Sequence, residues 1–240
     1  MPTVLITGAA KRVGKALAEL FAARDWEVVI HYNHSEEAAL DLSLGLQNKY
    51  PDRHFPIVRA DLSDGDKFVA LLMDKLPAPI KGLDALINCA SVFEPSSVAE
   101  TDYHLLRQQM AVNFEAPFML MQAFYQLHGS GAIVNILDTR IVNNSWSHAA
   151  YSLSKKALME LTRMAALEWA PGVRVNGVAP GPVLPPPDKD AAHLKKVAAD
   201  TPLKKVVGLN DLAESVWFLI ANSAITGQII FCDSGAHLKG

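Results

Sequence analysis

The sequence predicts an α/β protein whose doubly wound, Rossmann-type parallel sheet has about seven strands, with helices on both faces. Short apolar runs that are typical of buried strands alternate with longer segments of helical periodicity, and this alternation covers nearly all of the 240 residues. A chain of this length with 50% hydrophobic residues can bury one large core. We therefore expect one domain over residues 1–240, with ligands outside the carboxyl ends of the strands.

The first unit is an apolar run over residues 4–6, a short loop and an amphipathic helix. Gly8 and Gly14 flank the loop, so backbone N–H groups at the helix start can approach a phosphate. The spacing differs from G-x-G-x-x-G, and a plain turn between strand and helix explains it equally well. Arg12 is unexpected, because a bulky cation stands where the loop is tightest.

The remaining elements follow from composition and turn residues. Strands are expected at residues 27–32, 55–60, 85–88, 131–137, 173–179 and 228–232. Helices are expected at residues 35–49, 65–76, 149–169 and 210–221, and within residues 102–127. Pro185, Pro186 and Pro187 cannot lie inside a helix or a central strand, so a long loop is expected over about residues 181–200.

Charge, cysteines and hydropathy exclude several classes of function. The net charge is −3 and the basic residues are scattered, which argues against a nucleic-acid partner. Cys89 and Cys232 lack the spacing of a disulfide framework or a zinc site, so no metal is expected. No apolar run approaches the length of a membrane span, and no secretion signal is present. We expect a cytoplasmic protein that does not bind membranes.

Tyr151 and Lys155 are the strongest local signal for chemistry, because residues i and i+4 share one face of a helix. A cation beside a phenol is expected to lower the pKa of Tyr151, which suits a general acid or base. Such a pair also occurs by chance on surface helices, so its meaning depends on motifs elsewhere in the chain.

Those motifs exist, and together the chain resembles the short-chain dehydrogenase/reductase family over nearly its whole length. The resemblance implies hydride transfer with a nicotinamide cofactor, with a proton moved by Tyr151 and with Lys155 and Asn113 assisting. It also implies a homotetramer. The positions implied to bind the cofactor are Gly8, Lys11, Arg12, Val13, Asp61, Leu62, Asn88, Ala90, Tyr151, Lys155, Pro180 and Gly181.

Three departures from the common family pattern are similar to the pteridine reductases: Arg12 in the first loop, Ser91 with Phe93 after the fourth strand, and Asp138 in a serine position. This resemblance implies a pterin or folate that stacks on Phe93 beside Ser91 and contacts Arg12. Asp138 would bind Tyr151 or the pterin nitrogens, and the loop at 181–200 would border the substrate. The plainer readings are a core aromatic, a loop cation and a turn cap.

The segment after the second strand predicts the choice of cofactor. An acidic residue there would bind a ribose 2′-hydroxyl and repel a 2′-phosphate, but Asn33, His34 and Ser35 occupy the place. With Lys11 and His31 nearby, a phosphate can be accepted, so NADPH is the expected cofactor.

We therefore expect NADPH-dependent reduction of a dihydropterin, with dihydrofolate as a further candidate. A carbonyl or ketoacyl reductase of the same family is the first alternative, but it would keep the serine that Asp138 replaces. A nonenzymatic dinucleotide-binding regulator is the second, but it would not need Tyr151, Lys155 and Asn113 together. Trp146 and His148 are not assigned to the site, because aromatic rings there equally well pack against the sheet.

Overall fold

The strands of the computed structural model form one parallel sheet in the order β3-β2-β1-β4-β5-β6-β7, which confirms the predicted fold class. The structure describes residues 1–74, 76, 80, 82–144, 146–185 and 190–239. The strands are β1 (Thr3–Ile6), β2 (Glu27–Tyr32), β3 (Ile57–Arg59), β4 (Ala85–Asn88), β5 (Gly131–Ile136), β6 (Val173–Pro180) and β7 (Ile229–Cys232). The order changes direction between β1 and β4, where a doubly wound sheet binds its ligand.

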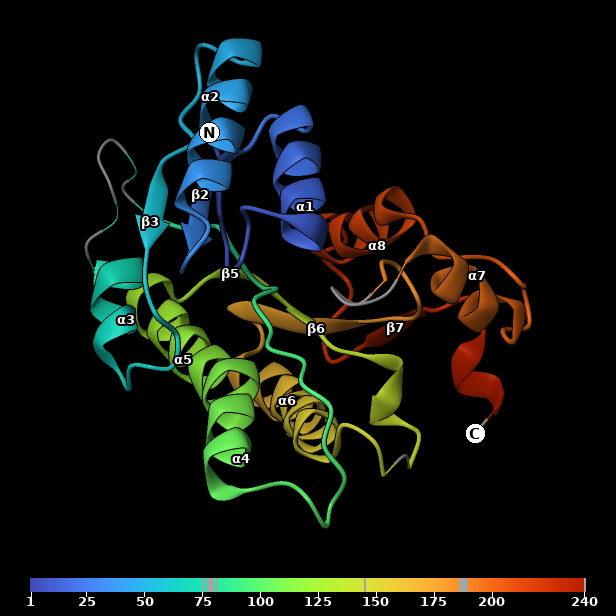
Figure 1. The fold of residues 1–240 in the computed structure, drawn as a ribbon. Coiled ribbons are helices and arrows are strands. Elements are labelled where there is room, and N and C mark those ends of the chain that lie inside the picture. The colour runs from blue at the N-terminus through green and yellow to red at the C-terminus, as the bar shows by residue number, and fades with distance from the viewer. Residues whose placement is uncertain (75, 77–79, 81, 145, 186–189, 240) are drawn as a thin grey trace.

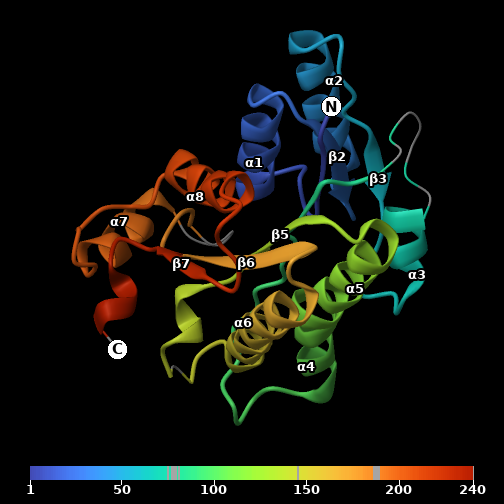
Figure 2. The ribbon, with the colours of Figure 1, turned by 180° about the vertical axis from the view of Figure 1, so that it is seen from behind.

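Helices cover both faces of this sheet (Figures 1 and 2). One layer consists of α1 (Arg12–Ala23), α2 (Glu36–Lys49) and α8 (Leu209–Ala221), and the other includes α3 (Lys67–Val69), α4 (Tyr103–Met110), α5 (Ala116–His128) and α6 (Ala149–Trp169). Strand β1 shows why: Val4 and Ile6 pack on the first layer, while Leu5 packs on the second. Alternation along a strand buried on both faces thus creates two cores.

The element boundaries differ from expectation mainly in two places. The strand expected over residues 55–60 is only Ile57–Arg59, although Phe55 is buried beside it. The helix expected over residues 65–76 is the short α3, which continues as a π-helical turn over Ala70–Asp74. Both segments lie at the β3 edge of the sheet, where fewer packing contacts stabilise the helix or strand that the local sequence favours.

The segment 181–200 is not a continuous loop. Helix α7 (Ala191–Ala199) occupies its second half, so the expectation of a loop over the whole range is wrong there. The prolines at 186 and 187 lie outside the described residues. The remaining loop approaches the carboxyl end of the sheet through Pro180 and Gly181, and α7 follows it near the C-terminal end of the chain (Figure 1).

Candidate active site

The first loop folds around its two glycines. A Cβ on Gly14 would lie 2.2 Å from the Gly8 carbonyl oxygen, and Gly8 itself adopts a φ of 66° against Ala90. The N-cap residue of α1, Lys11, makes no side-chain capping bond, and it is exposed. The positive end of α1 therefore opens onto a close-fitting backbone turn, which suits an anionic group.

Arg12 adopts a φ of 54°, in the left-handed region that favours glycine. This backbone conformation explains why glycine is the common family residue at the position that Arg12 occupies here. Its guanidinium Nη2 donates a hydrogen bond of 2.9 Å to the Pro185 carbonyl oxygen. The side chain thus spans from the nucleotide loop to the segment that follows β6, rather than pointing into solvent alone. The neighbouring Val13 packs against the core of the first helix layer.

His31 does not lie where a phosphate would bind, so its assignment as a nearby phosphate-accepting group is wrong. The ring is 2% exposed, and burial lowers its pKa to about 4, so it is neutral. Gly8 N donates to His31 Nδ1 at 3.0 Å, which leaves the proton on Nε2, 3.0 Å from the Ala60 carbonyl oxygen. His31 therefore fastens the first loop to the end of β3.

Polar groups gather where β2 and β3 end. Asn33, His34 and Ser35 are at least partly exposed, and Ser35, the N-cap residue of α2, makes no side-chain capping bond. Asp61 is exposed and accepts bonds from Ser63 N at 2.9 Å and Oγ at 2.7 Å, which lower its pKa. The adjacent Leu62 instead packs in the core.

The end of β4 is tied to the first loop. Thr7 Oγ1 accepts bonds from Cys89 N at 2.9 Å and Ala90 N at 3.0 Å. Asn88 is 3% exposed, and its Oδ1 is a buried acceptor without a partner in the described part of the chain. An orphaned buried acceptor beside the loop is a place where a ligand hydroxyl fits.

Asn113 lies in a π-helical turn over Ala111–Glu115 between α4 and α5. It is fully buried, and its Oδ1 accepts from Ser91 Oγ and Val92 N, both at 3.0 Å. Its amide donates to the Val92 carbonyl oxygen and to Gln109. The structure thus places Asn113 in contact with Ser91. The sequence assigned Ser91, together with Phe93, to the substrate site.

Tyr151 and Asp138 form the centre of the site. Helix α6 carries Tyr151, whose Oη donates a hydrogen bond of 2.9 Å to Asp138 Oδ2, and Asp138 lies two residues after the end of β5. Burial and the adjacent carboxylate hold the pKa of Tyr151 well above its usual value, which corrects the expectation that Lys155 lowers it. A phenol with a raised pKa stays protonated, so Tyr151 holds a proton that it could transfer to a ligand.

Lys155 is 2% exposed, and burial lowers its pKa to about 8. Its Nζ donates a bond of 2.8 Å to the Ile136 carbonyl oxygen and lies 5.9 Å from the centre of the Tyr151 ring. Its other donors make no hydrogen bond within the part of the chain that the structure describes. A buried ammonium with free donors suits a ligand that carries hydroxyl groups.

Phe93 has two neighbours that sequence reasoning did not assign to the site. His148 stacks on Phe93, with ring centres 4.2 Å apart and planes 13° apart, and the Arg140 guanidinium carbon lies 5.8 Å from the Phe93 ring centre. Tyr151 meets Phe93 edge to face at 4.7 Å. Trp146 is 75% exposed. The sequence pattern gave no indication that Arg140 belongs to the site. His148 could have been assigned to the site because it lies three residues before Tyr151.

The loop after β6 closes the remaining side. Pro180 ends β6, and its carbonyl oxygen accepts a bond of 2.9 Å from Thr139 Oγ1. Gly181 packs so closely on Asp233 that a Cβ would lie 2.7 Å from the Asp233 Cα. The residues that the sequence assigned to cofactor and substrate thus line the carboxyl ends of the strands, with His31 and the Leu62 side chain inside the fold.

Comparison with known families agrees with this arrangement. Residues 8–237 match a family model described as "Enoyl-(Acyl carrier protein) reductase", a branch of the short-chain dehydrogenases. The chain belongs to the short-chain dehydrogenase/reductase family. This confirms the family predicted from the motif order.

Among relatives in this family, a dihydromonapterin reductase of Enterobacter sp. (strain 638) is 27% identical, with 98% of this chain and 97% of that protein covered. A crystal structure of FolM alternative dihydrofolate reductase 1 from Brucella suis, in complex with NADP, is 32% identical with a TM-score of 0.91, covering 99% of this chain and 95% of that one. The Brucella canis protein of the same name, also complexed with NADP, is 32% identical with a TM-score of 0.89, covering 99% and 94%.

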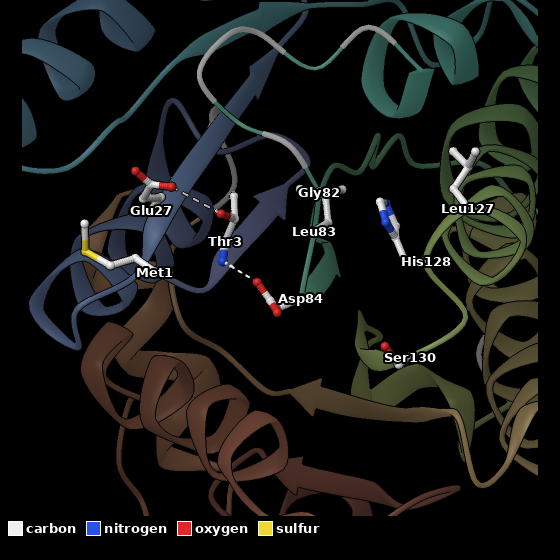
Figure 3. Close-up of a pocket in the computed structure, with 9 residues that line it drawn as sticks. All are labelled: Met1, Thr3, Glu27, Gly82, Leu83, Asp84, Leu127, His128 and Ser130. Carbon is white, nitrogen blue, oxygen red and sulfur yellow. Dashed lines mark hydrogen bonds between the residues drawn. The ribbon is translucent and has the colours of Figure 1, made fainter.

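A hollow of about 500 Å³ lies at the other end of the sheet (Figure 3). It is lined by residues that begin or precede strands, among them Thr3, Glu27 and Asp84, so it is remote from the candidate site at the carboxyl ends. Thr3 N and Oγ1 already bond to Asp84 and Glu27. Within the described residues, no cluster of metal-ligating side chains occurs and no helix is long and apolar enough to cross a membrane.

Proposed function

We propose that the protein is an NADPH-dependent reductase of dihydropterins. The observation that carries this proposal is the 2.9 Å hydrogen bond from Tyr151 to Asp138, in a position where the family's common pattern has serine. A carboxylate there would repel the oxygen of a carbonyl substrate, whereas it can accept from the amino and ring N–H groups of a pterin. The names of the relatives support the same substrate class.

The residues present fit the cofactor. The tight turn at Gly8 and Gly14 with the open end of α1 suits a pyrophosphate, and Lys11 and Ser35 with Asn33 and His34 would face a 2′-phosphate. Asp61 would contact the adenine. Buried Asn88 and Lys155 offer unpaired polar groups to a ribose, and Ala90, Pro180 and Gly181 would line the nicotinamide. The NADP in both Brucella structures supports this assignment.

The reaction proposed is addition of a hydride and a proton across the C6=N5 bond of a 7,8-dihydropterin. When bound, NADPH supplies the hydride to C6. Tyr151 donates its phenolic proton to N5, which requires the protonated phenol that burial and Asp138 maintain. Lys155 remains anchored to Ile136 and provides positive charge near the phenolate that forms. Asn113 holds Ser91 in place.

The pterin would stack on Phe93, with Arg12 at its edge. Phe93 is 39% exposed although His148 stacks on it, so part of the ring is accessible to a ligand. A flat heteroaromatic ring gains about 0.5–1.5 kcal/mol from such stacking beyond burial. Cytoplasmic location and a homotetramer stay predictions from the sequence, as does a role of the loop that begins at Gly181 in bordering the substrate.

The test is an assay of NADPH oxidation with purified protein and a panel of substrates. The panel contains dihydromonapterin, dihydrofolate, a simple ketone, a ketoacyl thioester and an enoyl thioester. We expect turnover of the pterins alone, and loss of about 10²- to 10⁴-fold in Tyr151→Phe, the scale of general acid catalysis. Tyr103→Phe, at an exposed tyrosine, is the matched control. Turnover of ketones or thioesters without pterins would refute the proposal, and NADPH binding without any turnover would favour a regulator.

A further inference from the structure

Phe93, the ring on which the pterin is proposed to stack, is surrounded by three side chains of the candidate site. His148 stacks on one face of Phe93 in nearly parallel contact, and the Tyr151 ring stands nearly perpendicular to Phe93. Burial of His148 lowers its pKa, and the positive charge of Arg140 lowers it further. At neutral pH His148 is therefore an uncharged ring and adds no charge to the stack. A ligand that contacts Phe93 would therefore lie close to both Tyr151 and Arg140.

Arg140 is built into the same turn as the proposed proton-transfer pair. It lies two residues after Asp138, and its backbone N–H donates a bond of 2.8 Å to Asp138 Oδ1. Its guanidinium lies 5.8 Å from the Phe93 ring centre and is close enough to Tyr151 to oppose the rise in that residue's pKa. The cation is therefore at the reacting end of the site and not at a remote rim.

The guanidinium of Arg140 makes few polar contacts with the described residues. Its side-chain hydrogen bond is a long contact of 3.5 Å to Ser147 Oγ, and no carboxylate forms an ion pair with it among the described residues. Arg163, by comparison, pairs with Glu160 at 3.0 Å. A half-buried guanidinium with several free N–H donors is a group that a ligand can satisfy.

The position of Arg140 discriminates between the two kinds of pterin side chain. In a 7,8-dihydropterin the side chain starts at C6, the carbon next to the N5 atom that Tyr151 would protonate. The hydroxyl groups of monapterin begin on the first side-chain carbon, so they lie beside this reacting bond. The carboxylates of dihydrofolate are separated from C6 by the whole p-aminobenzoyl group, and its first side-chain atoms offer no hydroxyl.

We propose that Arg140 is a specificity-determining residue that donates hydrogen bonds to hydroxyl groups on the C6 side chain of the substrate. The inference rests on the proposed pterin reductase function and names the substrate within that class: a dihydropterin with a polyhydroxylated side chain. Arg140 selects this substrate over dihydrofolate and over pterins with a bare alkyl substituent. It takes no part in the proton transfer itself.

The experiment compares three substrates in the wild type, Arg140→Gln and Arg140→Lys: dihydromonapterin, 6-methyl-7,8-dihydropterin and dihydrofolate. For Arg140→Gln we expect kcat/KM to fall at least roughly 10-fold with dihydromonapterin, the scale of a hydrogen bond to a charged group, and to stay within about 2-fold with the other two. Arg140→Lys should lose less, because a cationic donor remains. Arg163→Gln, on an exposed part of α6, is the control.

An equal fall with all three substrates would overturn the inference, because it would indicate a structural role or an effect on Tyr151. No change with dihydromonapterin, or a loss confined to dihydrofolate, would also overturn it, the latter by showing a carboxylate site. If the wild-type protein reduces none of the three while binding NADPH, the proposed function itself fails, which is a different result from any of these.

Discussion

Asp138 Oδ2 accepts the hydrogen bond of Tyr151 Oη at 2.9 Å, although the two residues come from different elements, the turn after β5 and the first turn of α6. This pairing changes how the tyrosine is expected to work. A fixed negative charge beside a buried phenol favours the neutral, protonated form, so Tyr151 keeps its proton across the neutral range. In the proposed mechanism, Lys155, one turn along the helix, would stabilise the phenolate after the proton has left.

Substitution of Asp138 by asparagine should move the alkaline limb of activity. The carboxylate raises the pKa of Tyr151, so its removal lowers that pKa, and the protonated phenol is lost at lower pH than in the wild type. We expect the alkaline limb of kcat against pH to shift downward and kcat near neutrality to fall about 10- to 100-fold. Asp138→Ser restores the common family residue and should also lose pterin turnover. Undiminished turnover in Asp138→Ser would remove Asp138 from the mechanism.

Arg12→Gly should separate substrate binding from cofactor binding. Glycine is favoured at a φ of 54°, so the loop is retained and the protein is not destabilised. We expect the Kd for NADPH to stay within about 3-fold and the KM for the pterin to rise about 10-fold, the scale of a lost charged hydrogen bond. Lys15→Gly would be disruptive within α1, so the exposed Lys15→Gln serves as the control. An unchanged pterin KM in Arg12→Gly would make Arg12 only a bridge to Pro185.

His31 should contribute to the acid sensitivity of folding. Its pKa is about 4 in the fold against 6.5 for an ordinary histidine, so between these values the unfolded chain binds more protons and stability falls as pH falls. Between about pH 7 and pH 4.5 this linkage removes on the order of 2–3 kcal/mol from the free energy of unfolding. Urea denaturation of wild type and His31→Gln at both pH values measures it. Equal acid losses in the two proteins would contradict this role.

His148→Ala should weaken pterin binding through Phe93. The stacked imidazole holds the Phe93 ring, and loss of such an aromatic pair costs about 0.5–1.5 kcal/mol, so the KM for the pterin should rise roughly 2- to 10-fold without a change in the Kd for NADPH. His148→Phe should restore the KM, and Trp146→Ala, at an exposed ring, should have no effect. A rise in KM for Trp146→Ala as large as that for His148→Ala would show that the whole loop, and not the ring pair, is responsible.

Sequence pattern predicted the sheet well because its strands are buried on both faces, and continuous apolar runs such as Val4–Ile6 leave little ambiguity. It predicted less at the β3 edge and in the segment that contains α7. At the site, the family resemblance implied that Asp138 contacts either Tyr151 or the pterin, and the structure shows the bond to Tyr151. The rise in the pKa of Tyr151 was not predicted, because it comes from burial and from the adjacent carboxylate. Burial, which decides the role of His31, cannot be predicted from the order of residues in the sequence.

The π-helical turn over Ala111–Glu115 constrains the number of residues between α4 and α5. A π turn holds one residue more than an α turn, so α4 and α5 are out of phase by one position. Deleting a single residue there would let one uninterrupted α-helix form but would rotate α4 about 100° against α5 and turn Asn113 away from Ser91. The segment therefore tolerates no change in the number of residues between the two helices.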